Sequence, residues 1–419
     1  MAIGIETVFL ILGGLIFIGY FGEHLSRRLT IPVAFLLLLI GFGLRFSGIV
    51  DAQDFLGIQG IFGTLALIVL LFDGGLSLNL YDAVFKSGRS LFAGFFTTVL
   101  ATIITAGFFL MIGLDPIIGA IIGAIVGGID TGITLSLMHS MTFPEKVKNF
   151  LTIESSSNDV ISIILAIVLT QALILGAINP AFIAQEIVGK FAIGIFIGIL
   201  VGVASILTLA KIEQGYNYMI TLAIVLLLYS TTEFLNGSGA IAVLVFGIVL
   251  GNETSIRRAI HSKEVESYPM IKEFQSEVSF FIRTFFFVFL GIVVTIGNTN
   301  SLIISAILMI ILYLIRYIVI HIATVNSEME IHKKMLVAIN PRGLATAVLA
   351  TYPLIVVQNE IAANPDFPAA EIIAKLGILP EVAFYLIILS VIFTTILLPI
   401  SKGMEKNNKE EEQVKEMRI

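Results

Sequence analysis

Residues 152–162 read Thr-Ile-Glu-Ser-Ser-Ser-Asn-Asp-Val-Ile-Ser, a polar stretch placed directly before the apolar run of residues 163–177. The stretch contains two carboxylates, Glu154 and Asp159, together with an amide and several hydroxyls. If the run crosses a membrane, these groups lie partly in hydrocarbon, where ionisable residues are costly and mark ion or proton pathways. The stretch is therefore the first candidate for a functional site.

Helical spacing divides the polar stretch between two faces. Ser155 and Asp159 are four residues apart and share one face, whereas Glu154 and Asn158 share the adjacent face. The first face combines a hydroxyl with a titratable carboxylate, as a cation site would. The second face combines an acid and an amide that need partners from other segments.

The composition is that of a membrane protein. Hydrophobic residues make up 57% of the 419 residues and charged residues 13%, whereas soluble domains contain about 25% charged residues. Apolar runs of spanning length, about 17–25 residues each, recur along the whole chain. There are no cysteines, which excludes disulfides, thiolate metal sites and cysteine nucleophiles. The fold class is therefore an all-α polytopic membrane protein.

We predict thirteen membrane-spanning helices, the ninth of them short and rich in glycine. The first is interpreted as a span rather than a cleaved signal peptide, because it lacks a basic start and carries Glu6. The predicted ranges are 5–23, 31–49, 60–80, 90–113, 115–138, 150–177, 184–210, 215–235, 237–251, 271–296, 301–321, 335–357 and 381–400.

The distribution of Lys and Arg predicts the orientation of these spans. Eighteen of the 24 basic residues fall in the loops after odd-numbered spans 1 to 11 or in the C-terminal tail. The opposite loops hold Arg45, Lys190 and Lys375. By the positive-inside rule, the N-terminus lies outside the cell and the C-terminus in the cytoplasm, which predicts a multi-pass protein of the cell membrane.

Two of the predicted spans are interrupted near their middle. The fifth contains Gly127-Gly128-Ile129-Asp130-Thr131-Gly132, and the twelfth contains Asn340-Pro341-Arg342-Gly343. Such breaks survive at membrane depth where they are buried in protein or line a cavity. If spans 1–6 and 8–13 are repeats, each broken span is the fifth of its half, and the odd offset of seven makes the repeats inverted. Paired broken helices in inverted repeats indicate a transporter's binding site.

The converging half-helices also predict roles for the two charged residues in the breaks. Asp130 is expected to offset the partial positive charge of converging helix N-termini. Arg342 is expected to offset the partial negative charge of converging helix C-termini. Close packing alone would also produce such kinks, but a charge at both matched positions favours the functional interpretation.

Three further charged residues fall in or beside predicted spans. Asp73, followed by Gly74 and Gly75, is either a cation-attracting carboxylate at the cytoplasmic mouth or a helix-end acid. Arg283 lies among phenylalanines and is expected to pair with a group on another span. Arg316 is expected to extend toward the cytoplasmic interface, with no role.

Several of these motifs together resemble those of a known family. Glu154, Ser155, Asn158 and Asp159 resemble the Glu-Ser-x-x-Asn-Asp signature of the NhaP-like sodium/proton antiporters in the cation:proton antiporter superfamily. The stretch 72–76, Phe-Asp-Gly-Gly-Leu, and the stretch 341–343, Pro-Arg-Gly, also resemble that family, in the same order and on the same spans. The resemblance extends over essentially the whole chain.

The resemblance implies a homodimer that serves pH homeostasis, with crossing broken helices 5 and 12 beside the site. It also implies a transport bundle and a dimerisation scaffold in each protomer. The expected division is scaffold helices 1–3 in 1–80, bundle helices 4–6 in 90–177, linker helix 7 in 184–210, scaffold helices 8–10 in 215–296, bundle helices 11–13 in 301–400 and a charged cytoplasmic tail in 401–419.

The resemblance also implies a role for each matching residue. Asp159 binds the cation and the proton in turn, with Ser155, Asp73, Asp130 and the backbone carbonyl of Ile129 as further ligands. Asp159, Ser155 and Asp73 would contact the transported metal cation. The supporting residues are Asn158, which braces the unwound segment, Glu154 and Arg342, which pair with each other, and Thr131 and Arg283.

One motif departs from the family pattern. The family usually has Thr-Asp-Pro at the break in the fifth span, and this chain has Ile129-Asp130-Thr131. A backbone carbonyl at position 129 survives the change, but a threonine hydroxyl at that position does not. The departure bears on ion preference more than on the fold.

These features predict electroneutral one-for-one exchange of Na⁺ or Li⁺ for a proton at a single aspartate, with no cofactor and no nucleic-acid partner. A K⁺/proton antiporter with the same fold is the main alternative. A channel is disfavoured because no selectivity-filter run is present. An intramembrane aspartyl protease is a remote alternative, since Ile129 occupies the place of the glycine that its Gly-x-Gly-Asp motif requires. The chain is therefore expected not to be an enzyme.

Overall fold

The computed structural model is built from helices packed around a buried apolar core, with no strand in the part of the chain that it describes. The described residues are 13–22, 24–25, 33–48, 52–78, 87–140, 143–175, 180–209, 217–259, 268–293, 299–363 and 369–416.

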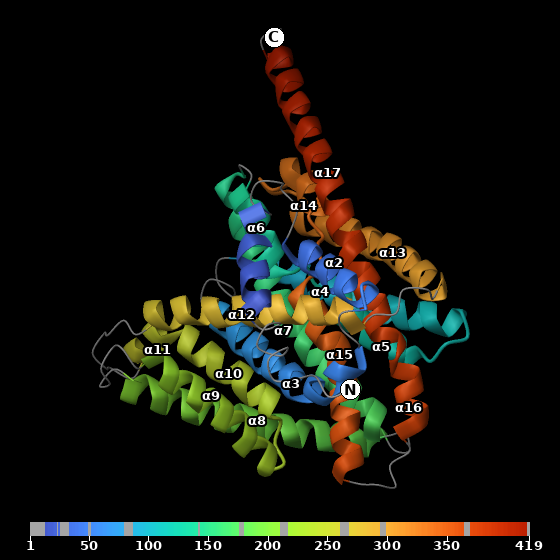
Figure 1. Ribbon diagram of the computed structural model, residues 1–419. Coiled ribbons are helices and arrows are strands. Elements are labelled where there is room, and N and C mark those ends of the chain that lie inside the picture. The colour runs from blue at the N-terminus through green and yellow to red at the C-terminus, as the bar shows by residue number, and fades with distance from the viewer. Residues whose placement is uncertain are drawn as a thin grey trace.

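Long apolar helices make up most of the structure (Figure 1). The α-helices from α2 on in the first half of the chain are α2 (Val33–Phe46), α3 (Ala52–Ser77), α4 (Gly88–Met111), α5 (Pro116–Val126), α6 (Thr131–Ser140), α7 (Glu145–Leu175) and α8 (Pro180–Leu209). Those in the second half, which include the short helices α11, α14 and α16, are α9 (Asn217–Phe234), α10 (Gly239–Gly251), α11 (Glu253–Ala259), α12 (Tyr268–Val293), α13 (Thr299–Thr324), α14 (Lys333–Ala338), α15 (Leu344–Ala363), α16 (Ala369–Leu376) and α17 (Ile378–Glu416).

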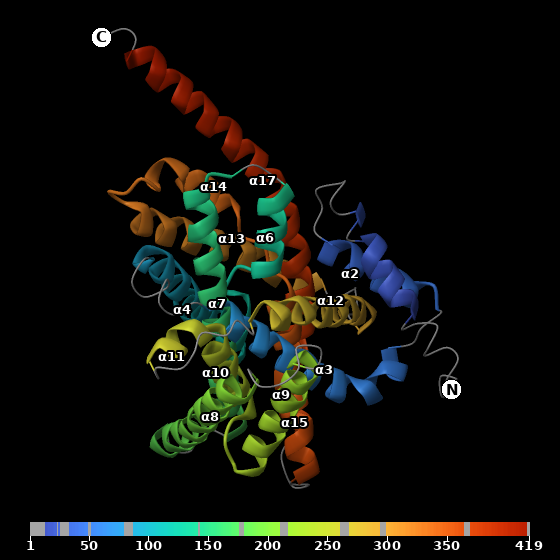
Figure 2. The same ribbon diagram turned by 90° about the vertical axis from the view of Figure 1, so that its left-hand side faces the viewer.

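The predicted spans coincide with these helices. Seven helices in the described residues are long and apolar enough to cross a membrane, and five shorter apolar helices accompany them. The tenth predicted span falls on α12, and the beginning of the first lies outside the described residues. The C-terminal tail continues α17 to Glu416, and this end of the helix projects beyond the bundle in both views (Figures 1 and 2). The all-α polytopic fold is therefore confirmed.

The helices pack in two sets. In one set α10 contacts α3, α8 and α9, and α12 contacts α2 and α3. In the other α4 contacts α5, α7 and α13, while α17 contacts α13, α14 and α15. Figure 2 shows α8, α10 and α11 at one end of the molecule and α13, α14 and α6 toward the other. Helices α3 and α12 both contact α15, so the two sets meet at the second broken span.

Glycines allow the closest of these helix contacts. A Cβ on Gly75 of α3 would lie 2.4 Å from the carbonyl oxygen of Leu244 on α10. A Cβ on Gly247 of α10 would lie 2.7 Å from the Phe72 carbonyl oxygen. Small residues at helix contacts in membrane proteins let backbones approach in this way. The Gly74-Gly75 pair after Asp73 therefore lies inside a packed helix rather than forming a stop, since α3 continues to Ser77.

Both predicted interruptions are present. Helix α5 ends at Val126 and α6 begins at Thr131, so residues 127–130 are non-helical. Helix α14 ends at Ala338 and α15 begins at Leu344, which leaves residues 339–343 non-helical. The two breaks are joined directly, because the Asp130 N–H donates to the Pro341 carbonyl oxygen at 3.0 Å. The segments thus meet at one point inside the helical bundle.

Candidate ion-binding site

The polar stretch of residues 152–162 lies in the middle of α7, which passes beside both halves of the first broken span and beside α15. Glu154, Ser155 and Asn158 are fully buried, whereas Asp159 is half-buried. A buried polar group that finds no hydrogen-bond partner lowers the stability of the protein by about 1–3 kcal/mol. The partners of these side chains therefore define the site.

Asp159 is held by the start of α6. Its Oδ2 accepts a hydrogen bond of 2.7 Å from the Thr131 hydroxyl. Among the described residues, the charged side chains that act on Asp159 are the carboxylates of Asp130 and Asp73. The carboxylate of Asp159 therefore lies near one hydroxyl and two other acids, which brings four of the predicted site residues together.

Asp130 fastens the two broken spans to each other. Its Oδ1 accepts from the Ile133 N–H at 2.7 Å and its Oδ2 from the Leu344 N–H at 2.8 Å. These donors belong to the first turns of α6 and α15, whose N–H groups have no partner within their own helices. One carboxylate thus caps two helix N-termini, where negative charge is favoured. The prediction that Asp130 offsets converging N-terminal ends is consistent with this geometry.

The same capping bond releases the backbone carbonyl of Ile129. In a continuous helix that carbonyl would accept from the N–H of residue 133, but the Ile133 N–H donates to the Asp130 side chain. Ile129 is itself fully buried beside Asp130. Its carbonyl oxygen therefore lacks the helical N–H donor that it would have in a continuous helix. A carbonyl oxygen in this state is available as a ligand for a cation.

Gly343 is required by the closeness of the two breaks. A Cβ at this position would lie 2.4 Å from both Cγ and Oδ2 of Asp130. Any side chain would therefore displace the carboxylate from the N-terminus of α15. The glycine next to Arg342 in the sequence thus serves close approach rather than an unusual backbone angle.

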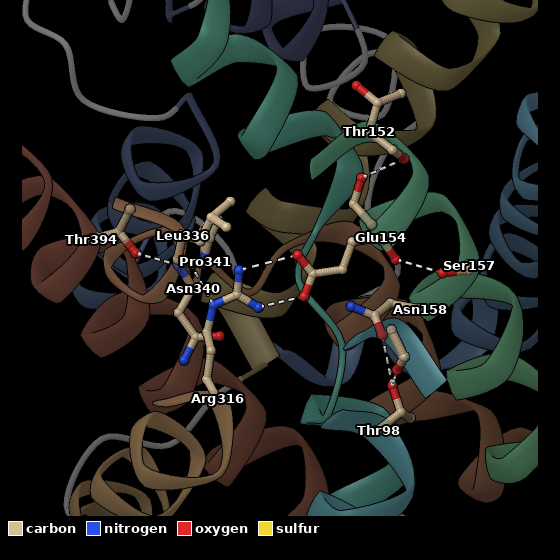
Figure 3. Close-up of polar contacts among 12 residues, drawn as sticks. Thr98, Thr152, Glu154, Ser157, Asn158, Arg316, Leu336, Asn340, Pro341 and Thr394 are labelled. Carbon is tan, nitrogen blue, oxygen red and sulfur yellow. Dashed lines mark hydrogen bonds and ion pairs between the residues drawn. The ribbon is translucent and has the colours of Figure 1, made fainter. Parts of the chain in front are cut away.

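The partner of Glu154 is Arg316, and the predicted pairing of Glu154 with Arg342 is wrong. Arg316 Nη1 lies 2.8 Å from Glu154 Oε1, and Nη2 lies 3.3 Å from Oε2 (Figure 3). Both side chains are fully buried. The expectation that Arg316 extends to the interface is also wrong, because its Nε donates to the Leu336 carbonyl oxygen of α14 at 2.9 Å. Arg316 therefore links α13, α7 and α14.

Arg342 is used within its own break. Its Nη1 donates to Asn340 Oδ1 at 2.9 Å and to the Asn340 carbonyl oxygen at 3.2 Å. The guanidinium is fully buried and lies in the electrostatic field of Arg316, Glu154 and Asp130. Two acids and two bases thus balance one another around the crossing.

Two hydroxyls of α17 that the sequence analysis missed hold the same break. Ser390 Oγ accepts from the Arg342 N–H at 2.8 Å, and Thr394 Oγ1 accepts from the Asn340 N–H at 3.3 Å. The signal that could have revealed them is their spacing of four residues in an otherwise apolar span, which places both hydroxyls on one helix face. Figure 3 shows Thr394 beside Asn340.

Asn158 contacts both the first break and α4. Its Oδ1 accepts from the Thr98 hydroxyl at 3.0 Å (Figure 3). A Cβ on Gly128 would lie 2.9 Å from the Asn158 Cβ. Asn158 therefore packs directly against the unwound segment, and its role as a brace stays a prediction.

The remaining predicted residues lie around this centre with other partners. The Ser155 hydroxyl donates to the Thr152 carbonyl oxygen at 3.2 Å, along its own helix. Asp73 is half-buried and accepts from the Ser279 hydroxyl of α12 at 3.4 Å. The guanidinium of Arg283 lies against Gly132, where a Cβ would meet its Cζ at 3.4 Å. Arg283 thus lies beside the first turn of α6.

Comparison with known proteins finds similarity over most of the chain. Residues 13–403 match the transmembrane domain of the sodium/hydrogen exchangers. The Na⁺/H⁺ antiporter 1 of Methanocaldococcus jannaschii is 26% identical over 428 residues, covering 96% of this chain and 92% of that protein. The K⁺/H⁺ antiporter NhaP2 of Shewanella sp. strain MR-4 is 25% identical over 265 residues, covering 62% of this chain and 46% of NhaP2. The aligned region thus spans under half of the length of that relative.

The fold has also been observed experimentally. The structure of the sodium proton antiporter MjNhaP1 from Methanocaldococcus jannaschii at pH 8 superimposes with a TM-score of 0.76 at 22% sequence identity. The match covers 96% of this chain and 99% of that one. The chain therefore belongs to the transmembrane sodium/hydrogen exchanger family, within its NhaP-like cation:proton antiporters.

Proposed function

We propose that this protein exchanges a monovalent cation for a proton across the membrane, and that Asp159 carries both in turn. The supporting observation is the surroundings of Asp159, whose carboxylate meets the Thr131 hydroxyl and two acids. Glu154, by contrast, is neutralised by Arg316. A half-buried carboxylate with no basic partner in the described part of the chain takes up a proton or a cation to neutralise it.

The cation would be held by oxygen atoms from three segments. Asp159 supplies the charge, the Ile129 carbonyl and the Thr131 hydroxyl supply neutral ligands from the first break, and Asp73 contributes from α3. Ser155 joins this set if its hydroxyl turns from the Thr152 carbonyl toward Asp159, which is four residues further along the same helix face. Asp130 has both carboxylate oxygens engaged in capping, so it acts on the cation through water and through its charge.

Competition for one carboxylate gives the stoichiometry. A monovalent cation and a proton each neutralise Asp159, and the neighbouring Asn158 cannot titrate. Each cycle then exchanges one positive charge for another and is electroneutral. Alternating access would arise from movement of the helices that carry the crossing relative to the scaffold.

Sodium is the proposed ion, with lithium as a second substrate, because the ligands are hard oxygens close to a carboxylate. Potassium is the specific alternative. The relatives named NhaP2 are K⁺/H⁺ antiporters, and a wider ligand cage would accept the larger ion. The hydroxyl that reaches Asp159 comes from Thr131 rather than from position 129, so this cage differs from the usual family pattern.

The wider organisation is also proposed. Helices in 90–177 and 301–400 would form the transport bundle, and those in 1–80 and 215–296 a scaffold through which two copies dimerise. The contacts of α4 with α13, and of α10 with α3, support this division. Basic loops at the end from which α17 projects would face the cytoplasm, with the N-terminus outside the cell membrane.

Proton flux in proteoliposomes tests the proposal. Purified protein would be reconstituted with a pH-sensitive dye inside, and Na⁺, Li⁺ and K⁺ would be supplied in turn. Cation-dependent proton movement with Na⁺ is expected, and its initial rate should be unchanged when a potassium ionophore clamps the voltage. The absence of flux with all three ions would overturn the antiporter proposal, and a strong voltage effect would overturn electroneutrality.

A further inference from the structure

We propose that a cavity between α13, α14 and α17 binds an anionic phospholipid and regulates the proposed exchange activity, on which the regulatory part depends. The cavity has a volume of about 300 Å³ and lies at the end of the bundle from which α17 projects. Its polar lining includes His321, Lys333 and Lys334, and its apolar lining includes Leu397 and Ile400.

The charges of the cavity favour an anion. Lys333 is half-buried, and its ammonium lies 3.8 Å from the Glu330 carboxylate, a loose contact with a residue on its own turn. Lys334 is exposed at the mouth of the cavity. His321 adds a hydrogen-bond donor and stacks on the ring of Tyr317, with ring centroids 5.9 Å apart. The two positive charges and the imidazole donor are suited to binding a phosphate group.

The surrounding surface favours a lipid over a soluble anion. Tyr317, Ile318 and Ile322 of α13 and Ile396 and Ile400 of α17 are all at least half exposed, so their apolar faces are directed outward. A tyrosine at this level is typical of the interface between hydrocarbon and headgroups. A phospholipid would satisfy both walls, its headgroup on the lysines and an acyl chain along α17. Basic pockets between spanning helices on the cytoplasmic side bind anionic headgroups in this manner.

The cavity is connected to the crossing by a short path. Lys333 and Lys334 form the first turn of α14, and Ala338 at the end of the same helix leads into the second break. Arg316 precedes Tyr317 on α13 and donates to Leu336 of α14. An occupant of the cavity would therefore bias the position of α14, which leads into the break that contains Asn340 and Arg342.

Lipid binding to the full-length protein tests the site without relying on transport. Native mass spectrometry would follow titration with phosphatidylglycerol, with phosphatidylcholine as the uncharged comparison. The wild type should retain phosphatidylglycerol preferentially. The variant K333Q/K334Q should bind it roughly thirtyfold more weakly, because each of the two lysines near an anionic headgroup contributes about fivefold in affinity. The variant K333R/K334R should restore binding.

Two other lysines at the same end of the molecule provide a matched control. Lys146 pairs with Glu328 and Lys148 with Glu145, and neither lines the cavity. The variant K146Q/K148Q should bind phosphatidylglycerol like the wild type. Equal losses in the two double variants, equal binding of phosphatidylcholine, or displacement of the lipid by inorganic phosphate would each overturn the proposed site.

The regulatory part is tested in liposomes with and without phosphatidylglycerol. The lipid should change the rate of exchange by the wild type and of K146Q/K148Q, but not of K333Q/K334Q. An identical response of all three proteins would overturn regulation through this cavity. A complete lack of exchange by the wild type would instead overturn the proposed function, while the binding measurement would still decide the lipid site.

Discussion

Glu154 and Asp159 are carboxylates on the same helix, five residues apart, but their surroundings differ. Glu154 is fully buried and forms a two-bond ion pair with Arg316. Asp159 is half-buried and accepts a hydrogen bond from the Thr131 hydroxyl, with Asp130 and Asp73 as the nearby charges. The first is neutralised by Arg316, whereas the proposed function has the second neutralised by a proton or a cation.

This difference separates structural from functional charge within one turn and a half of helix. A buried ion pair costs desolvation energy, and removal of one partner leaves an uncompensated charge. Glu154 therefore holds helices together and cannot exchange its partner. Under the proposed function, Asp159 exchanges its partner because a hydroxyl stabilises its charge without cancelling it.

The largest functional effect is expected from Asp159→Asn. The amide keeps the size of the side chain but has no negative charge for a proton or a cation to neutralise. Exchange should therefore fall to the background of empty liposomes. Proton flux in proteoliposomes measures this loss. The control Asp115→Asn makes the same chemical change at the N-cap of α5, where asparagine caps equally well. Exchange retained by Asp159→Asn would place the site elsewhere.

The largest effect on stability is expected from breaking the other pair. Glu154→Leu or Arg316→Leu alone should destabilise the protein by about 3–5 kcal/mol, because the remaining buried charge is unpaired. The double variant should be markedly more stable than either single one. Thermal unfolding in detergent measures all three. If the single substitutions prove harmless, or the double variant shows the sum of their costs, the ion pair does not have this role.

A smaller, local effect is expected from Gly343→Ala. The added methyl would lie 2.4 Å from the Asp130 carboxylate, and overpacking of this kind costs about 1–3 kcal/mol. Exchange should also fall, because Asp130 would leave the N-terminus of α15. Gly107→Ala on α4, where nothing lies within 4 Å, is the control and should leave both properties intact. If the two variants have the same stability and exchange activity, the close contact between Gly343 and Asp130 is not required.

The smallest effect is expected from Thr131→Val, which removes the hydroxyl from Asp159 but keeps the shape. A hydrogen bond to a charged group contributes about 1.5–3 kcal/mol, so KM for the cation should rise by roughly tenfold. Thr131→Ser should retain most of the affinity, since serine keeps the donor. Cation titrations of the initial flux would show this, and unchanged KM in Thr131→Val would exclude the hydroxyl as a ligand.

Local patterns in the sequence accounted for much of this molecule. The spans, the two interruptions and the polar stretch of α7 all follow from hydropathy and from the positions of Gly, Pro and charged residues along single segments. The contact of Asp130 with two helix N-termini was likewise foreseeable, because a lone acid in a broken span has few other uses. The choice of Na⁺ over K⁺ stays a prediction, since it depends on ligand distances that only a bound ion would define.

The sequence by itself determined that this chain is a many-span helical membrane protein with two interrupted spans, one carrying an acid (Asp130) and the other a base (Arg342). Only the tertiary structure decided which base neutralises which acid. The sequence motifs predicted Arg342 as the partner of Glu154 and gave Arg316 no role, but the packing of α13 against α14 brings Arg316 to Glu154 of α7. The same holds for Thr131, Ser390 and Thr394, whose partners lie on other helices. Hydropathy is a property of one segment, whereas a pairing depends on where several distant segments meet.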